Sequence, residues 1–283
     1  MSWIVYALLA LTFFVIYDLA SRRVAVRSEN PQVFAAIYGL FVATMAPILF
    51  FLDSSLPKNI SPQVILITVI GLVIWGLFGR FEYFARANTE ASVFSIILKL
   101  APVLNFFLSL LVLNETWSLN KLTGMLTIII ANLLLFIGAK RHTVVSNKGL
   151  YYSILVSCLL ALGWLFDSIN VKFWGVGVFS IMSFLVVTIV SSIFPRIKLA
   201  DIKRELEITP WYEIYILGFF NLIGYGFLLK ALMIGETSSV IPITSSSTPF
   251  VVVFGIILLG EKKYIVRKIV ASLLAVLAIY LMR

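Results

Sequence analysis

Long apolar runs follow one another along the chain, separated by short polar segments. A helix needs about 20 apolar residues to cross the hydrocarbon core of a bilayer. On this criterion we expect ten membrane-spanning helices, near residues 3–20, 33–52, 63–84, 91–113, 121–139, 149–171, 174–194, 211–232, 238–259 and 267–282. The longest connection, residues 195–210, is bounded by prolines and rich in charge. We expect it at the membrane surface, either as a short amphipathic helix or as a loop.

The composition supports this fold class, an all-α polytopic membrane protein. Of the 283 residues, 61% are hydrophobic and 12% are charged, whereas soluble domains have about twice that charged fraction. The net charge of +9 does not indicate nucleic-acid binding, because basic residues of membrane proteins gather in cytoplasmic loops. We therefore expect the lipid bilayer as a partner and no nucleic acid.

The second half of the chain repeats motifs of the first half. At an offset of 146 residues, "ARANTEASV" (85–93) falls on "ALMIGETSS" (231–239). The first helices of the halves also correspond, because "FFVIYD" ends at Asp18 and "LGWLFD" ends at Asp167, an offset of 149. We therefore expect two repeats of five helices each, covering residues 1–141 and 149–283.

Five spans is an odd number, so the two repeats would face opposite ways across the membrane. Inverted repeats recur in transporters, with the substrate site at the repeat interface near the bilayer midplane. Of the 22 Lys and Arg residues, 15 lie in the odd-numbered loops and 4 on the other side. Because basic residues concentrate in cytoplasmic loops, we expect cytoplasmic odd-numbered loops, with both termini outside, in a bacterial or archaeal cell membrane.

The helix expected at 91–113 carries polar residues on one face, at spacings of three and four. This stripe comprises Ser92, Ser95, Lys99, Pro102, Asn105 and Ser109. The helix expected at 238–259 has a matching stripe of Ser238, Pro242, Ser245, Ser246 and Pro249. The two stripes either line a common cavity or let helices pack closely in lipid, as small polar residues do.

Lys99 favours the cavity, because a lysine in mid-helix costs about 2.5–3.5 kcal/mol on insertion scales and usually faces a cavity and a partner. Pro102 and Pro249 are expected helix kinks. Each frees a carbonyl one turn earlier, which is tolerated where that carbonyl meets a cavity or a partner group. At the offset of 146, Ser245 stands where the first repeat has Lys99.

Carboxylates are expected near both lysines of the membrane interior. We expect Asp18 or Glu82 to pair with Lys99 towards the odd-numbered loops, and Asp167 to pair with Lys230 towards the even-numbered loops. The alternatives are structural ion pairs or, for Lys230, a side chain that snorkels to the interface. A functional Lys99 would bind a carboxylate or phosphate of the substrate. Otherwise a carboxylate such as Asp18 would take up a proton.

Aromatic and acidic residues complete the set of candidates. Trp75, Trp164 and Tyr225 lie near mid-span and could stack on a ring or cover a cation, and Asn221 lies four residues before Tyr225. The alternative for each is simple packing. Acidic residues at helix ends are expected to cap or anchor those helices: Glu90, Glu115, Glu236 and Glu261.

Several kinds of chemistry leave no trace in the sequence. There is no glycine-rich phosphate loop with Lys-Ser/Thr, which excludes ATP hydrolysis of that kind. No serine or paired-aspartate protease arrangement appears, so we do not expect an enzyme. The single cysteine, Cys158, and the single histidine, His142, have no metal-spaced companions, so we expect neither a metal nor a cofactor.

These features together resemble the EamA family of the drug/metabolite transporter superfamily. The resemblance lies in the two sets of five spans and in the fourth helix of each repeat. That helix has a small-residue start ("EASV", "ETSSV"), an internal proline and an acidic residue at its exit ("LNE", "LGE"). The resemblance covers nearly the whole chain. It implies a proton-coupled or facilitated carrier of small organic solutes, such as amino acids, metabolites or drugs.

We therefore expect a secondary transporter that moves a small polar solute, such as an amino acid or another metabolite, by alternating access. Proton coupling and a homodimer are the further arrangements that this interpretation leaves open. The alternative is a non-transporting membrane partner or scaffold subunit that shares the fold.

Overall fold

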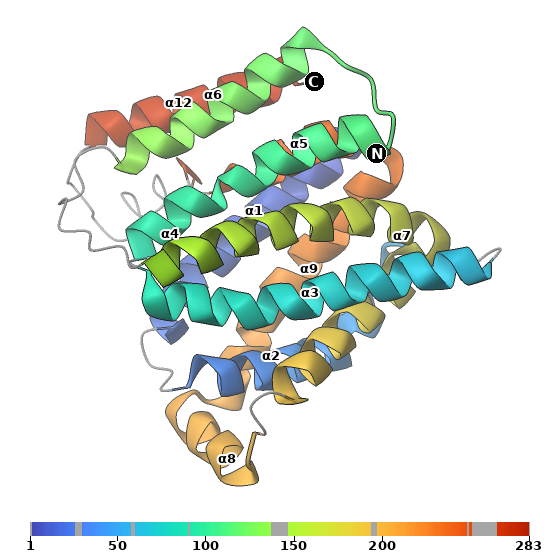
Figure 1. Ribbon diagram of the computed structural model, residues 1–283, viewed down its shortest axis with the longest axis vertical. Coiled ribbons are helices and arrows are strands. Elements are labelled where there is room, and N and C mark those ends of the chain that lie inside the picture. The colour runs from blue at the N-terminus through green and yellow to red at the C-terminus, as the bar shows by residue number, and fades with distance from the viewer. Residues whose placement is uncertain are drawn as a thin grey trace.

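The computed structural model describes residues 2–25, 30–57, 60–89, 91–136, 147–193, 197–247, 249–250 and 265–282. These residues are almost entirely helical (Figure 1). The helices are α1 (Trp3–Ala25), α2 (Pro31–Met45), the 3₁₀ helix η1 (Ala46–Phe51), α3 (Pro62–Asn88), α4 (Ala91–Leu98), α5 (Leu100–Val112), α6 (Leu119–Phe136), α7 (Asn147–Ile193), α8 (Leu199–Ile208), α9 (Trp211–Ile234), α10 (Thr237–Thr244) and α12 (Ile265–Leu281).

The structure confirms the all-helical fold class and places apolar helices where most spans were expected. Five helical segments are long and apolar enough to cross a membrane, and one of them, Lys148–Val190, holds two expected spans in its 43 residues. Shorter apolar helices cover three more expected spans, at Ile96–Val112, Leu119–Leu135 and Ile269–Leu281. The span expected at 238–259 is described only up to residue 250, without residue 248.

Local signals in the sequence fix where several helices begin. The side chain of Asn30 accepts hydrogen bonds from the N–H groups of Gln32 and Val33 at the start of α2. Ser61 accepts from the N–H of Val64 at the start of α3. In both helices a proline occupies the first turn, where its missing N–H costs nothing. The charged connection after α7 forms the short helix α8, which decides between the two expected alternatives.

Two of the expected helices are interrupted in their middle. The span at 91–113 is two helices, α4 and α5, separated at Lys99, whose N–H bonds to Ile96 O at 3.1 Å in place of an α-helical partner. In the second repeat α10 ends at Thr244, and a turn follows at Ser245 and Ser246. Because proline cannot donate to a carbonyl one turn earlier, Pro102 and Pro249 explain both interruptions.

A third interruption divides α7. Gly175 has φ 71° and ψ 166°, and the chain reverses direction there (Figure 1). Backbone at these angles is nearly confined to glycine. The two parts of α7 therefore correspond to the two spans expected at 149–171 and 174–194.

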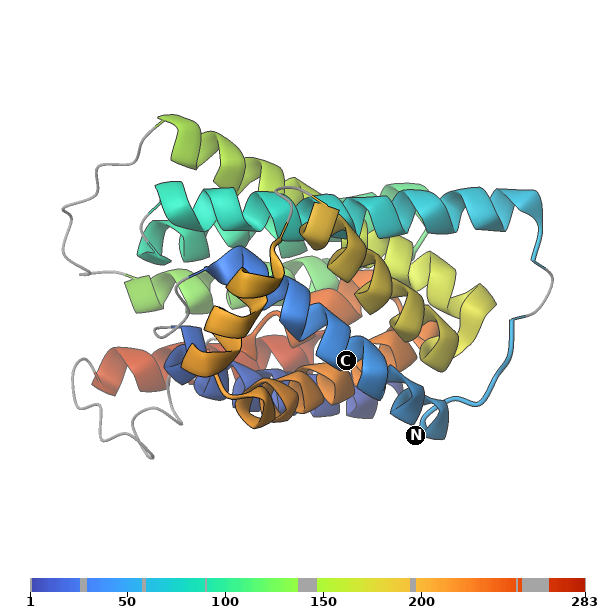
Figure 2. The same cartoon turned by 90° about the horizontal axis from the view of Figure 1, so that it is seen from below.

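The two repeats interlock instead of forming separate bodies. Several extensively packed helix pairs join one repeat to the other: α1 with α9, α3 with α7, α5 with α10, and α6 with α12. Figure 1 shows α6 and α12 side by side along one edge of the bundle, and Figure 2 shows α3 along the opposite face from α12. The centre of the bundle is therefore built from both repeats.

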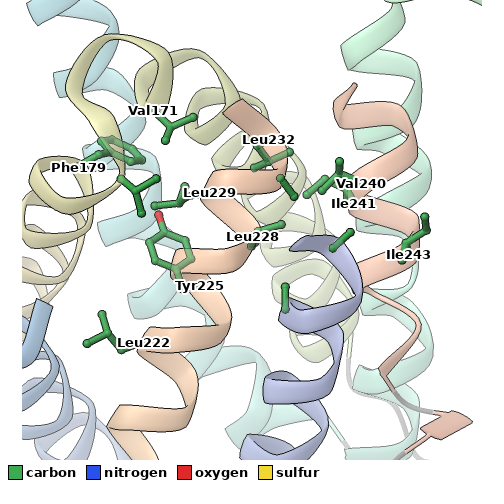
Figure 3. Close-up of a cluster of buried hydrophobic side chains, with 14 of the residues drawn as sticks. Val171, Phe179, Leu222, Tyr225, Leu228, Leu229, Leu232, Val240, Ile241 and Ile243 are labelled. Atoms are coloured by element: carbon green, nitrogen blue, oxygen red, sulfur yellow. The ribbon is translucent and has the colours of Figure 1, made fainter. Parts of the chain in front are cut away.

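The largest buried cluster lies where α7, α9 and α10 meet (Figure 3). Leu222 and Leu229 of α9 pack there with Val171 and Phe179 of α7. Tyr225 is the polar member of this cluster, and its hydroxyl points towards α7. A buried tyrosine hydroxyl usually requires a hydrogen-bond partner, and the partners of Tyr225 belong to the candidate site.

Charged residues join the repeats at the end of the bundle where the even-numbered loops lie. Glu115, after α5, accepts hydrogen bonds from the N–H groups of Thr237 at 2.6 Å and Ser238 at 2.8 Å, so it caps the start of α10. Glu236, before α10, accepts from the Thr116 hydroxyl at 2.8 Å, and it also forms an ion pair with Lys121 of α6. The expectation that Glu115 and Glu236 cap or anchor helices is confirmed. Glu90 and Glu261 lie outside the described residues.

Candidate functional site

Lys99 lies at the junction of α4 and α5 and reaches the other interrupted helix. Its Nζ donates to the carbonyl oxygen of Ser245 at 3.4 Å. Ser245 precedes Pro249 by four residues, so this is the carbonyl that the proline leaves without its helical donor. The two residues are also equivalent in the repeat. This contact thus joins an ammonium group from one repeat to a freed carbonyl from the other.

A small pocket opens beside this junction, between the two interrupted helices and α6. Its volume is about 10 Å³, roughly the room that one water molecule needs. The lining residues are Lys99, Pro102, Met125, Ile128, Ile129, Asn132, Pro242 and Ser245. Asn132 Oδ1 and Ser245 Oγ are buried without a hydrogen-bond partner among the described residues. Residues of both polar stripes therefore line one pocket, whose surface is almost entirely apolar in this state.

Asp18 belongs to the same region. Its carboxylate accepts a hydrogen bond from the Ser247 hydroxyl at 3.1 Å, just past the turn that ends α10. It also lies within electrostatic range of the Lys99 ammonium. The alternative partner, Glu82, is half-buried near the end of α3. Of the two carboxylates considered for Lys99, the structure gives Asp18 the electrostatic contact.

Asp167 forms a second polar centre on α7. It is fully buried, with 0% of its surface exposed. Trp75 Nε1 of α3 donates to Oδ1 at 2.8 Å, and the Tyr225 hydroxyl of α9 donates to Oδ2 at 3.1 Å. The Tyr225 oxygen also lies 3.4 Å from Ser183 Oγ. Three separately predicted candidates, Asp167, Trp75 and Tyr225, therefore meet in one cluster.

The predicted pairing of Asp167 with Lys230 is wrong. Lys230 Nζ lies 3.2 Å from Asp53 Oδ1, in the connection between η1 and α3. Asp53 Oδ2 accepts from the Ser55 hydroxyl at 2.7 Å and from the N–H of Val176 at 3.1 Å, directly after the break in α7. Lys230 thus neither snorkels alone nor reaches the site. It fastens α9 to the reversal in α7.

Protonation of Asp53 should weaken this connection. Burial alone would raise the pKa of Asp53, but hydrogen bonds from Ser55 and Val176, together with Lys230, outweigh it and hold the pKa below its ordinary value of 3.8. A carboxylate with a lowered folded-state pKa stabilises the fold above its unfolded-state pKa. That contribution disappears as the pH falls through the folded-state pKa.

We therefore expect Asp53→Asn to lower the free energy of unfolding at neutral pH by about 1.5–3 kcal/mol, the range for hydrogen bonds to a charged group. Wild type and variant should converge as the pH falls below 3.8 and through the lowered folded-state pKa of Asp53. Thermal unfolding of the purified protein across this pH range measures the difference. Lys230→Met removes the other partner of the ion pair. If both substitutions abolish the same interaction, the double variant should be no less stable than either single variant. A difference that persists unchanged into acid would contradict the assignment.

Other predicted candidates lie away from the two polar centres or contact only backbone. Asn105 Nδ2 donates to Ala161 O at 3.0 Å and the Ser246 hydroxyl to Ile243 O at 2.6 Å, so both serve packing in this structure. Trp164 packs in the buried clusters. Asn221 lies beside the Tyr38 hydroxyl. The side chains of Ser92 and Ser95 lie outside the described part of the structure.

Sequence reasoning missed three contributors to these centres. Ser183 lies within an apolar run and carried no signal except its position in a predicted span. Ser247 directly follows the polar stripe of its helix, so extending the stripe by one residue would have found it. Asp53 lies in the connection between two expected spans, and no motif there indicated a partner for it. Among the described residues, no group of three His, Cys, Asp or Glu side chains could hold a metal ion.

Comparison with known proteins places this architecture in a family. Residues 1–137 and 147–283 each match the EamA-like transporter family. No curated protein matches the chain. One solved crystal structure shares the fold, with a TM-score of 0.76 and 12% sequence identity over 99% of this chain and 95% of that chain. Because the family match extends over both repeats, the chain belongs to the EamA-like transporter family, within the drug/metabolite transporter superfamily.

Proposed function

We propose that this protein is a secondary carrier of a small organic solute with a carboxylate group, bound at the Lys99 pocket. The observation that carries the proposal is the position of the Lys99 ammonium between two interrupted helices, one from each repeat. A lysine in this position is costly to insert into the membrane. Binding of a solute at an adjacent pocket would explain why the chain has a lysine here. Asn132 Oδ1 and Ser245 Oγ are the polar atoms that a bound solute could satisfy.

The chemistry of the pocket favours an anionic group. The lysine ammonium supplies a compact positive charge with three donors, which suits a carboxylate oxygen. Asp18 lies within electrostatic range of the same ammonium and would attract an amine on the solute. A zwitterion such as a free amino acid therefore fits both charges. A solute with a carboxylate and no amine would fit only the first.

The size of the pocket favours alternating access. A volume of about 10 Å³ holds no organic solute, so the two repeats would have to separate before a solute reached Lys99. The charged contacts of Glu115, Glu236 and Asp53 join the repeats at the even-loop end, and these contacts would have to break for entry from that side. Inverted repeats provide such a movement around a fixed central site. From the charge distribution we infer that the odd-numbered loops are cytoplasmic.

Ligand-dependent stabilisation of the purified protein tests the proposal. The panel contains free amino acids, monocarboxylates and dicarboxylates, each paired with the corresponding amide, which has the same shape without the charge. We expect at least one carboxylate to stabilise the protein, by about 2.7 kcal/mol at 100 times its dissociation constant, and its amide to do so far less. Equal effects of carboxylates and amides would contradict binding at Lys99. The absence of any response would favour the non-transporting partner or scaffold.

A further inference from the structure

We propose that Asp167 binds and releases a proton, and that the Tyr225 hydroxyl reverses its hydrogen bonding between Asp167 and Ser183 as it does so. This proposal concerns the cluster around Asp167, whose residues do not line the Lys99 pocket. Its role in coupling a proton to transport rests on the proposed function, whereas the binding of the proton does not.

The surroundings of Asp167 suit the binding of a proton. The carboxyl group is fully buried. Both of its recorded contacts are hydrogen bonds from uncharged donors, Trp75 and Tyr225, and no Lys or Arg among the described residues forms an ion pair with it. A buried ionised carboxylate without a cation is costly. Binding a proton removes that cost without any change of volume.

The hydrogen bonds of this centre can be satisfied in either protonation state. When Asp167 is ionised, Oδ1 accepts from Trp75 and Oδ2 accepts from Tyr225, as the distances of 2.8 and 3.1 Å show. When Asp167 is protonated, its own O–H needs an acceptor. The indole N–H of Trp75 can only donate, but a phenol oxygen can accept and donate at once. Tyr225 could then accept from Asp167 and donate to Ser183 Oγ, 3.4 Å away.

Ser183 completes the arrangement. Its hydroxyl donates to Phe179 O at 2.9 Å, so its oxygen remains available as an acceptor. Tyr225 and Ser183 are 9% and 5% exposed, so neither hydroxyl has ready access to water in this state. The proton added to Asp167 therefore stays on the carboxyl group, and only the orientation of the Tyr225 hydroxyl hydrogen changes. No bond other than the O–H bond of Asp167 forms or breaks.

The centre also connects the two repeats, which gives protonation a structural consequence. Trp75 belongs to α3 of the first repeat, whereas Asp167, Ser183 and Tyr225 belong to α7 and α9 of the second. Protonation changes the Trp75 contact from a bond to a charged acceptor into a bond to a neutral one, and the former is about twice as strong. The contact of α3 with α7 at this level should therefore weaken when the proton binds.

Other charged or titratable groups on the neighbouring helices are occupied elsewhere or lie nearer the ends. Lys230 is paired with Asp53, Lys172 is exposed, and Lys99 contacts Ser245. The remaining groups on the elements packed against α7 are Tyr38 on α2, Arg80, Glu82, Tyr83 and Arg86 on α3, and Tyr212, Glu213 and Tyr215 on α9. On α7 itself they are Lys148, Tyr151, Tyr152 and Cys158. Tyr225 is the one that bonds to Asp167 in the described structure.

Infrared difference spectroscopy of the purified protein during a pH titration tests the assignment, with the proton itself as the probe. We expect a carboxylic-acid C=O band that titrates in wild type and is absent from Asp167→Asn. Intrinsic fluorescence should change with the same midpoint, and Trp75→Phe should remove that change. Asp53→Asn is the matched control, because it removes an aspartate from a different centre and should leave the band in place.

Ser183→Ala provides the decisive comparison, because Ser183 does not touch the carboxyl group. Loss of the final acceptor should weaken proton binding to Asp167 about tenfold, the equivalent of about one hydrogen bond. Wild-type proton affinity in this variant would overturn the relay, and the absence of any Asp167-dependent band would overturn proton binding itself. The titration needs no transported solute. Failure of every carboxylate to bind would therefore count against the Lys99 pocket alone.

Discussion

Lys99→Met is expected to abolish carboxylate-dependent stabilisation while the protein stays folded. Removing a charged hydrogen-bond donor costs about 1.5–3 kcal/mol, which is about a 10- to 100-fold loss of affinity. The same substitution removes an ammonium group that is costly to place in mid-membrane. We therefore expect the free energy of unfolding to stay the same or to rise. Thermal unfolding with and without the stabilising carboxylate, at several pH values, measures both effects.

Lys99→Arg and Asp18→Asn separate the roles of charge and geometry. Arginine keeps the charge but replaces a compact ammonium with a planar guanidinium, so we expect an intermediate affinity. Asp18→Asn should leave carboxylate binding in place and weaken binding of compounds that also carry an amine. If Lys99 is only a structural partner of Asp18, Lys99→Met would instead lower stability, because it leaves a buried carboxylate unpaired. Full binding at every pH would likewise reduce Lys99 to a structural role.

Gly175→Val is expected to destabilise the fold by about 3 kcal/mol or more. The backbone at Gly175 has φ 71°, a region that costs other residues about 1–3 kcal/mol. A Cβ atom there would also lie 2.6 Å from the Ser55 hydroxyl oxygen and 2.7 Å from the Ser55 carbonyl oxygen. The valine must therefore push away the segment that holds Asp53 against α7. Thermal unfolding in detergent, together with the yield of folded protein, measures the loss.

Lys172→Ala is the control for this substitution, because Lys172 is an exposed helical residue three positions earlier. We expect its effect to stay within about 0.5 kcal/mol, as for most surface substitutions. A variant Gly175→Val as stable as Lys172→Ala would mean that the reversal in α7 can form without a glycine. The hydrogen bond between Asp53 and the N–H of Val176 would then not depend on the positive φ angle at residue 175.

The spans could be predicted because lipid imposes a single simple requirement. Every backbone polar group in the hydrocarbon must be satisfied within its own segment, so long apolar helices are the available solution. The repeat was equally accessible, because glutamates and small residues recur at a fixed offset. It was this offset that identified Ser245 as the counterpart of Lys99 before any contact was known. The prolines then indicated which carbonyl would be free, and the structure places the Lys99 ammonium at Ser245 O.

Partners across the bundle could not be predicted in the same way. Lys230 was assigned to Asp167 because both lie in helices that run towards the even-numbered loops, but position along the membrane normal says nothing about rotation around a helix axis. Asp53 was available as a partner only because the reversal at Gly175 brings Val176 and Lys230 together. To predict the cluster around Asp167, one would have to know how α3, α7 and α9 are oriented about their own axes relative to one another. Periodicity fixes the face of one helix but not the neighbour that the face meets.

The crossed contacts of Glu115 and Glu236 have a consequence for how such a molecule can be assembled. Glu115 of the first repeat caps a helix of the second, and Glu236 of the second holds a loop of the first. Each half therefore depends on a side chain of the other half to satisfy polar groups at its own helix ends. Helices α1 and α3 of the first half likewise pack against α9 and α7 of the second half. A half made alone would need a second half inserted upside down beside it. Because both halves belong to one chain, each molecule has one copy of each half, and the two are inserted in opposite orientations. Two independent five-helix subunits would have no such link to fix their ratio or their relative orientation.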